Sequence, residues 1–203
     1  MPVRKLLPRS FYIHPPDVVS RNLLGKLVTH RLDGESLTGR IVEVEAYFGL
    51  DDPASHSFPG KTERNAVLFG PPGVAYVYFI YGMHYCLNVS CEPDGQAGGI
   101  LIRALEPVEG LETMARLRKL PANARPQLLT SGPGRLCQAL GITRAGHNGI
   151  DVTKAASELQ FRDDGYRPEE ILATPRIGIT KAVERPHRFV IAGNRFVSGK
   201  LSA

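Results

Sequence analysis

The feature that most constrains the fold is an Asp33-Gly34 dipeptide between two segments rich in β-forming residues, 27–32 and 37–47. Asp-Gly favours tight hairpin turns because both residues tolerate the positive φ angles that such turns require. A tight turn joins antiparallel strands, so the sequence predicts an antiparallel pair here. A helical pattern over 16–24, with Gly25 placed to end it, predicts a short helix before the pair.

Residues 75–89 predict a second hairpin with an aromatic tip. Its two β-forming segments flank Gly82-Met83, and Gly82 is expected at the first central position of a two-residue turn. A loop follows the first hairpin over 51–73 and contains a short helical candidate near 64–69. Further strands are expected at 99–105 and 189–192, and helices at 110–119 and 134–140. We therefore expect an α+β fold with an antiparallel sheet.

The chain length of 203 residues suits one domain, and no internal repeat or low-complexity tract divides it. We therefore expect residues 1–203 to form a single domain. The longest apolar stretch, 74–89, is interrupted by Gly82 and carries polar residues, whereas a membrane span needs about 20 mostly apolar residues. Pro8 and the Pro15-Pro16 pair argue against a secretory signal. We expect a cytoplasmic protein that binds no membrane.

The charged residues favour a polyanionic partner only modestly. Lys and Arg number 25 against 20 Asp and Glu, and 18 of the 25 are arginine, whose planar guanidinium suits phosphate. Many unrelated proteins have a similar net charge of +5. The three cysteines form no Cys-x-x-Cys pair and the histidines do not fall at metal-ligand spacing with them, so neither a disulfide framework nor a zinc finger is expected.

Two carboxylates lie two residues apart on the second strand. Glu43, Glu45 and Tyr47 share one face of that strand, and a pair of carboxylates suits hydrolysis of a glycosidic bond. The alternative is a solvated strand face that carries two acids, which the spacing alone favours. Tyr76 and Tyr78 share a face of the second hairpin and could form an aromatic wall for a flat, electron-poor ring, although strand tyrosines are often packing residues.

Six ordered segments carry a much more specific signal. They are 40–47 (RIVEVEAY), 56–57 (HS), 62–65 (TERN), 76–83 (YVYFIYGM), 101–107 (LIRALEP) and 132–140 (GPGRLCQAL). Together they resemble the alkyladenine (3-methylpurine) DNA glycosylases. The matching blocks run from about residue 10 to residue 198, so the resemblance covers nearly the whole chain.

The resemblance implies a single α+β domain with a curved antiparallel sheet, surrounding helices and a protruding β-hairpin that intercalates into DNA. It implies a monofunctional glycosylase that flips out alkylated or deaminated purines, hydrolyses their N-glycosidic bond and leaves an abasic site, the first step of base excision repair. The partner is double-stranded DNA that contains damaged purines, and the enzyme is expected to be a monomer without metal or organic cofactor.

The resemblance also assigns the chemistry to particular residues. Glu45 matches the general base, whereas Glu43 belongs to the motif but is not the family's base. Arg103 and the backbone of Ile177 match groups that help to hold the nucleophilic water. The residues that match base-binding positions are Tyr47, His56 and Tyr78, which enclose the flipped base, and Asn88, which discriminates against the amino group of guanine.

Other matched positions lie against the nucleic acid. Tyr81 matches the residue that wedges into the duplex and fills the space of the extruded nucleotide. The residues expected to contact DNA are Met83, Lys61, Thr62, Arg64 and Arg135. Two departures affect this part of the match: His84 stands where vertebrate members have Tyr, and the loop between His56 and Thr62 is one residue shorter.

The expected chemistry needs one carboxylate and water. A methylated purine already carries positive charge, so its departure does not require the second carboxylic acid that glycosidases normally use. Lys61, in a flanking loop, is the only lysine in the pocket motifs, which favours water as the nucleophile. One alternative is a non-catalytic nucleic-acid-binding domain of the same fold. Another is a lyase that uses a lysine amine or an exposed Pro2.

Overall fold

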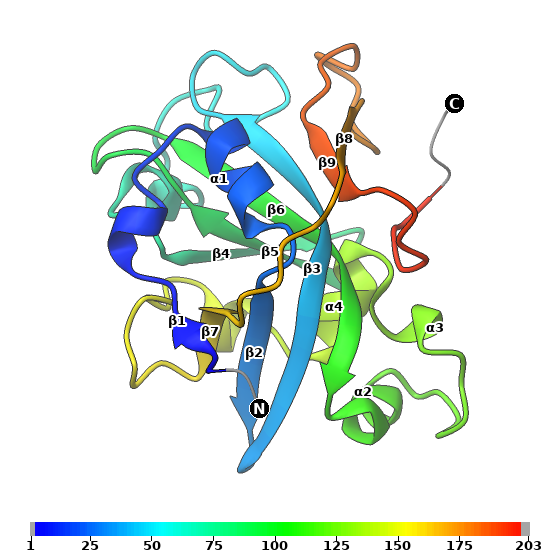
Figure 1. Ribbon diagram of the computed structural model, residues 1–203. Helices are drawn as coiled ribbons and strands as arrows, with labels where there is room; N and C mark the ends of the chain where they lie inside the picture. Colours follow the sequence, from blue (N-terminus) through cyan, green and yellow to red (C-terminus); the bar gives the residue numbers. More distant parts are fainter. Residues whose placement is uncertain (1–2, 200–203) are drawn as a thin grey trace.

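The computed structural model describes residues 3–199, in which nine strands form one antiparallel sheet (Figure 1). The strand order is β1-β7-β2-β3-β6-β5-β4, with β9 paired to β3 and β8 paired to β9. The strands are β1 (Lys5–Leu6), β2 (Leu27–Leu32), β3 (Glu35–Phe48), β4 (Ala75–Ile80), β5 (His84–Ser90), β6 (Gly98–Glu109), β7 (Leu159–Asp163), β8 (Ile171–Thr174) and β9 (Arg188–Ile191). The expected α+β class is confirmed.

The helices of the described residues are short. They are α1 (Pro16–Leu23), α2 (Leu111–Leu117), α3 (Gln127–Thr130), α4 (Pro133–Ala139) and α5 (Arg144–His147), with 3-10 turns η1 (Arg9–Phe11) and η2 (Ala66–Phe69). The predicted helices at 16–24 and 110–119 are confirmed with shorter bounds, and the one at 134–140 is confirmed one residue earlier. The short helical candidate near 64–69 forms the 3-10 turn η2. The sequence reasoning missed α3, α5, β1, β7 and β8, because segments of two to five residues carry little periodic signal. No helix within residues 3–199 has the length and apolar character needed to cross a membrane.

The first hairpin forms as the Asp-Gly dipeptide predicts. Leu32 pairs with Glu35, and the two turn residues have positive φ angles of 50° for Asp33 and 82° for Gly34. The second strand is longer than expected and becomes the centre of the sheet: β3 pairs with β6 along one edge and with β2 and then β9 along the other (Figure 1). This strand therefore joins β2, from the first part of the sequence, to β9, from the last part.

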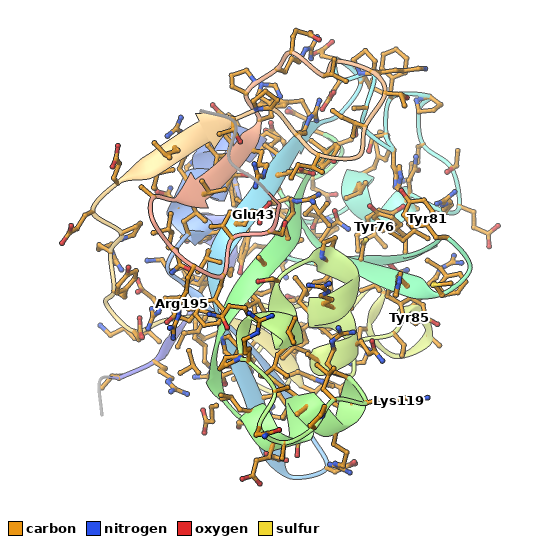
Figure 2. The ribbon with its side chains drawn as sticks, turned by 90° about the vertical axis from the view of Figure 1, so that its right-hand side faces the viewer. Glu43, Tyr76, Tyr81, Tyr85, Lys119 and Arg195 are labelled. Atoms are coloured by element: carbon orange, nitrogen blue, oxygen red, sulfur yellow. The ribbon has the colours of Figure 1, made fainter. Side chains whose placement is uncertain are left out.

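The second hairpin forms, but its turn differs from the prediction. Ile80 pairs with His84, and the N–H of Met83 donates to the carbonyl of Ile80 (3.2 Å). Tyr81 and Gly82 are the central residues, with φ angles of 51° and 68°, so Gly82 occupies the second central position rather than the first. Tyr81 is 80% exposed, and Figure 2 places it at the end of the hairpin, far from Glu43. A bulky residue at positive φ is uncommon and strained.

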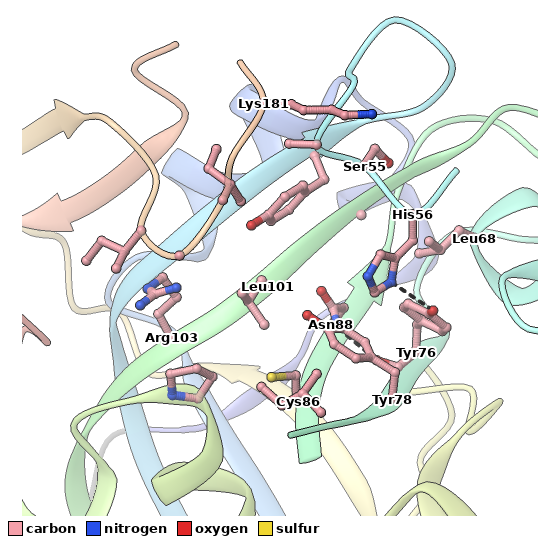
Figure 3. A pocket seen from close by; sticks show the side chains of 18 of the residues that line it. Ser55, His56, Leu68, Tyr76, Tyr78, Cys86, Asn88, Leu101, Arg103 and Lys181 are labelled. Atoms are coloured by element: carbon pink, nitrogen blue, oxygen red, sulfur yellow. Dashed lines mark hydrogen bonds between the residues drawn. The ribbon is translucent and has the colours of Figure 1, made fainter. Parts of the chain in front are cut away.

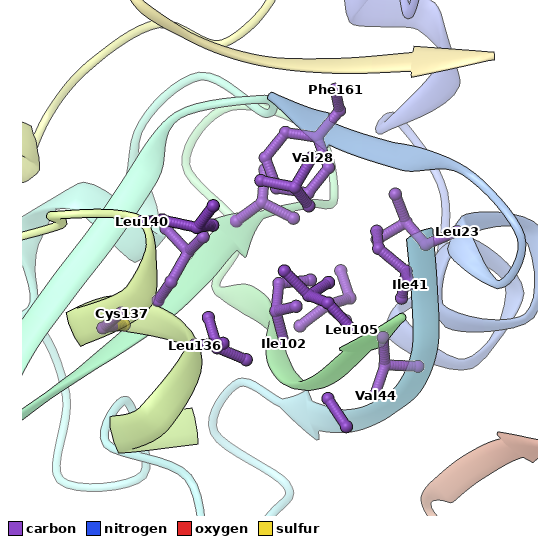
Figure 4. Packing of buried hydrophobic residues seen from close by; sticks show 14 of the residues in the cluster. Leu23, Val28, Ile41, Val44, Ile102, Leu105, Leu136, Cys137, Leu140 and Phe161 are labelled. Carbon is purple, nitrogen blue, oxygen red and sulfur yellow. The ribbon is translucent and has the colours of Figure 1, made fainter. Parts of the chain in front are cut away.

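Alternation along the central strands separates a core face from a second face. Val44, Ile102 and Leu87 are fully buried in one hydrophobic cluster (Figure 4). Leu136 of α4 and Leu23 of α1 belong to the same cluster, so both helices pack on this face. The neighbouring residues on each strand, including Glu45, must therefore point the other way.

Candidate active site

Four residues that face away from the core form one row across four neighbouring strands. Glu45 on β3 is opposite Leu101 on β6, Leu101 is opposite Asn88 on β5, and Asn88 is opposite Tyr76 on β4. Directly paired residues of an antiparallel sheet have side chains about 4.5–5.5 Å apart on the same face. The sheet register therefore gathers three predicted motifs into one site.

Leu101, Asn88 and Tyr76 of this row line a cavity of about 640 Å³ (Figure 3). A volume in the range of about 300–1,000 Å³ is usual for sites that enclose a small ring system. The predicted site residues that line it are Tyr47, His56, Tyr78, Tyr81, Asn88, Arg103 and Ile177. Tyr76, Cys86, Leu101 and the segment 178–181 complete much of the remaining wall. The sequence resemblance thus identified residues that the fold does bring together.

The Glu45 carboxylate lies one layer behind this wall. Its Oε1 accepts a hydrogen bond from the N–H of Ile177 (2.7 Å), and its Oε2 accepts one from the Tyr47 hydroxyl (2.8 Å). Oε2 also pairs with Arg103 Nη1 (3.2 Å). Burial raises the pKa of Glu45 above its ordinary value, although Arg103, the Ile177 N–H and the Tyr47 hydroxyl favour the charged form. All three donors line the cavity, so the carboxylate is held directly next to it.

The second carboxylate has a different environment. Glu43 is 0% exposed and accepts hydrogen bonds from Arg103 Nε (3.0 Å), Arg188 Nε (2.7 Å) and the N–H of Ser198 (2.6 Å). The interpretation of a solvated strand face is therefore wrong for both acids. Glu43 fixes the guanidinium of Arg103, which in turn reaches Glu45, so Glu43 positions the site without lining the cavity.

A buried ion pair that sequence reasoning missed holds Tyr47. Arg176 binds both oxygens of Asp52 (2.5 and 2.8 Å), and its guanidinium lies 4.6 Å from the centre of the Tyr47 ring. Burial opposes ionisation of Asp52, but Arg176 holds its pKa below the ordinary value. Asp52 and Arg176 are 124 residues apart, so no local pattern indicates their contact.

The aromatic wall on the far side of the cavity comes from the second hairpin and the loop before it. His56 Nδ1 lies 3.1 Å from the Tyr76 hydroxyl, and the His56 ring meets the Tyr78 ring edge-on at 4.5 Å (Figure 3). Burial and the nearby Arg64 lower the pKa of His56, which favours a neutral imidazole. Asn88 completes this side, and its Nδ2 donates to the carbonyl of Tyr76 (3.1 Å).

Among the residues predicted to meet DNA, Tyr81 alone both lines the cavity and is exposed. The others are exposed and lie outside the cavity wall: Met83, Lys61, Thr62, Arg64 and Arg135. Lys181, which lies outside the sequence motifs, lines the cavity, whereas Lys61, the only lysine in those motifs, does not. Pro2, considered above as an amine nucleophile, lies outside the described residues.

Comparison with known proteins shows which family the chain belongs to. Residues 10–195 match the family model described as methylpurine-DNA glycosylase. Three similar proteins are provisionally named 3-methyladenine DNA glycosylases. The one from Koribacter versatilis is 58% identical over 96% of this chain and 93% of its own length. The one from Alkaliphilus oremlandii is 48% identical over 96% of this chain and 99% of its own length. The one from Methanocella arvoryzae is 50% identical over 93% of this chain and 92% of its own length. The chain therefore belongs to the methylpurine-DNA glycosylase family.

Proposed function

We propose that this enzyme flips an alkylated or deaminated purine out of double-stranded DNA into the cavity and hydrolyses its N-glycosidic bond with water activated by Glu45. The observation that carries the proposal is the buried Glu45 carboxylate, which is fixed by three donors that also line an aromatic cavity. Enzymes that act on a base extrude it from the stack, and a cavity with an aromatic wall suits an extruded purine.

The negative charge of Glu45 can assist cleavage of the N-glycosidic bond. Departure of the purine places positive charge on the sugar, and a carboxylate beside the anomeric carbon both accepts a proton from water and stabilises that charge. The Ile177 N–H and Arg103 hold the two carboxylate oxygens in place. A carboxylate fixed in this way does not need to reorient during the reaction.

The aromatic residues favour a purine that carries positive charge. A cationic base stacked on Tyr47 or Tyr78 gains roughly 0.5–2 kcal/mol through cation–π contact. The same positive charge makes the purine a good leaving group without a protein acid. Alkylated purines such as 7-methylguanine therefore suit the cavity by both stacking and reactivity.

Tyr81 is proposed to fill the gap in the duplex. It stands at the tip of the second hairpin, 80% exposed, and it also lines the mouth of the cavity. A ring in that place can stack between bases while the extruded nucleotide enters beside it, which offsets an unstacking cost of a few kcal/mol.

Water is proposed as the nucleophile, which makes the enzyme monofunctional. Lys181 lines the cavity and is exposed, so it is the amine to test for lyase chemistry. Borohydride trapping on a lesion duplex separates the two mechanisms, because only a Schiff base becomes covalently linked. We expect no trapped complex with the wild type or with Lys181→Ala. The monomeric state and cytoplasmic location expected from the sequence stay predictions.

The decisive experiment compares two equally buried carboxylates. Single-turnover excision is measured on duplexes with 7-methylguanine, hypoxanthine or ethenoadenine, using wild type, Glu45→Gln and Glu43→Gln at a temperature where all three are folded. Glu45→Gln should lose at least about a hundredfold in rate while keeping duplex affinity. Glu43→Gln should mainly lower the melting temperature. Excision that survives Glu45→Gln would favour the alternative of a non-catalytic nucleic-acid-binding domain with a trace contaminating activity.

A further inference from the structure

Two buried histidines face each other in a part of the protein that does not line the cavity. His30 on β2 and His147 at the end of α5 are 2% and 6% exposed, and their Nε2 atoms are 3.0 Å apart. Glu158, directly before β7, places Oε1 3.8 Å from the Nε2 of His147. These three ligand atoms all lie within 4.8 Å of one another, and within residues 3–199 no other His, Cys, Asp and Glu cluster does so.

The other nitrogen of each ring faces a backbone carbonyl. His30 Nδ1 lies 2.6 Å from the oxygen of Leu140, and His147 Nδ1 lies 3.2 Å from the oxygen of Thr143. An imidazole that donates through Nδ1 keeps its lone pair on Nε2, and metal-binding histidines are commonly oriented in this way. Both rings can therefore present a lone pair to the same point in space.

The two histidines also satisfy each other's hydrogen bonds without a metal when His147 carries its proton on Nε2. The N–H of Thr143 lies 3.1 Å from His147 Nδ1, so that nitrogen can accept while Nε2–H donates to His30. The transition to a metal-bound state then begins with a change of tautomer at His147. This arrangement explains how the chain would fold before it takes up metal.

We propose that His30, His147 and Glu158 bind a divalent transition-metal ion of the zinc type, with water as the fourth ligand. Two imidazoles and a carboxylate are ligands that suit zinc. With metal–nitrogen distances of about 2.0–2.1 Å, tetrahedral ligands lie about 3.3 Å apart. The 3.0 Å gap between the rings needs only slight opening, and the Glu158 side chain is half exposed and free to approach.

The proposed metal would join three segments at one end of the sheet. After α5 the chain runs along the outer strand β4, where the N–H of Gly149 donates to Ala75 and the N–H of Ala75 donates to Ile150 (both 2.8 Å). A metal at His147 would hold this segment to β2 and to the start of β7. We therefore assign it a structural role, stabilising the edge strand that carries Tyr76 and Tyr78. This departs from the expectation of a metal-free protein.

The test uses the full-length protein after chelator treatment, with Zn²⁺ and Co²⁺ as probes. Calorimetry with Zn²⁺ should give one equivalent bound, and Zn²⁺ should raise the melting temperature. Co²⁺ should give the visible absorption of a tetrahedral site. Glu158→Gln should weaken Zn²⁺ affinity at least about tenfold and His147→Gln at least about a hundredfold. His14→Gln, which removes an exposed histidine elsewhere, is the matched control and should bind as wild type does.

Glu158→Gln keeps the test independent of folding, because its side chain is half exposed whereas His147 is buried. Wild type that takes up no Zn²⁺ would overturn the proposal. Affinity that is equal in wild type and Glu158→Gln would overturn it as well, since the metal would then bind elsewhere. Excision activity of Glu158→Gln should change little at a temperature where the protein is folded, because the cluster does not line the cavity.

Discussion

Oε1 of Glu45 accepts a 2.7 Å hydrogen bond from the backbone N–H of Ile177, a residue 132 positions later in the chain. Substitutions of Ile177 other than proline keep this backbone donor, so they leave one oxygen of the carboxylate hydrogen-bonded. The other oxygen depends on side chains, the Tyr47 hydroxyl and Arg103. Substitution of Tyr47 or Arg103 should therefore change the pKa of Glu45 through its Oε2 atom.

The first prediction concerns pH. Glu45 acts as a base only when ionised, and burial raises its pKa, so excision of 7-methylguanine should rise with pH through a midpoint above the ordinary carboxyl value. Tyr47→Phe removes a hydrogen bond to the charged form and should move that midpoint upward. Single-turnover rates from about pH 4 to pH 9 measure it. A midpoint that stays in place would mean that another group controls the rate.

The second prediction concerns the hairpin tip. Tyr81→Ala should weaken binding to a lesion duplex about tenfold or more, and binding to a single strand with the same lesion much less, because only a duplex has a stack to open. Tyr81→Phe should retain duplex affinity. Tyr81→Gly should keep or raise the melting temperature, since glycine adopts a φ of 51° without strain. Equal weakening on both DNA forms would exclude the wedge role.

The third prediction concerns phosphate contacts. Arg64 and Arg135 are exposed and lie outside the cavity wall, where the resemblance places DNA. Each Arg→Ala change should reduce the slope of log affinity against log salt by about 0.9. Arg167→Ala is a suitable control, because Arg167 pairs with Asp163 away from the cavity. An unchanged slope of log affinity against log salt would mean that the tested arginine does not contact phosphate.

The fourth prediction concerns selectivity against guanine. Asn88 lines the cavity and is anchored by its bond to the Tyr76 carbonyl, so its side chain occupies a defined position near the base. Asn88→Ser should make room for an exocyclic amino group and allow excision of mispaired guanine, with activity on 7-methylguanine retained. Loss of the anchoring bond should cost about 1 kcal/mol of stability. Rates on guanine, hypoxanthine and 7-methylguanine check this, and a common decline on all three would indicate a purely structural residue.

Much of the local structure could be predicted from the sequence. Asp33-Gly34 specified the first hairpin, since few residues tolerate two successive positive φ angles. Gly25 marked the end of α1, and a Cβ there would also meet the Tyr166 ring at 2.8 Å. The tip of the second hairpin was placed correctly but its turn was not, because Tyr81 accepts a positive φ that its residue type disfavours.

The site itself depended on tertiary structure. Alternation on one strand could not separate Glu43 from Glu45, because both are buried on the same face and differ only in their partners. Those partners, Arg188 and Ile177, are more than a hundred residues away in sequence, as are Asp52 from Arg176 and His30 from His147. Backbone conformation is governed by neighbouring residues and therefore leaves a local pattern. Contacts between distant side chains arise only when the sheet register brings their strands together, and no local pattern in the sequence records them.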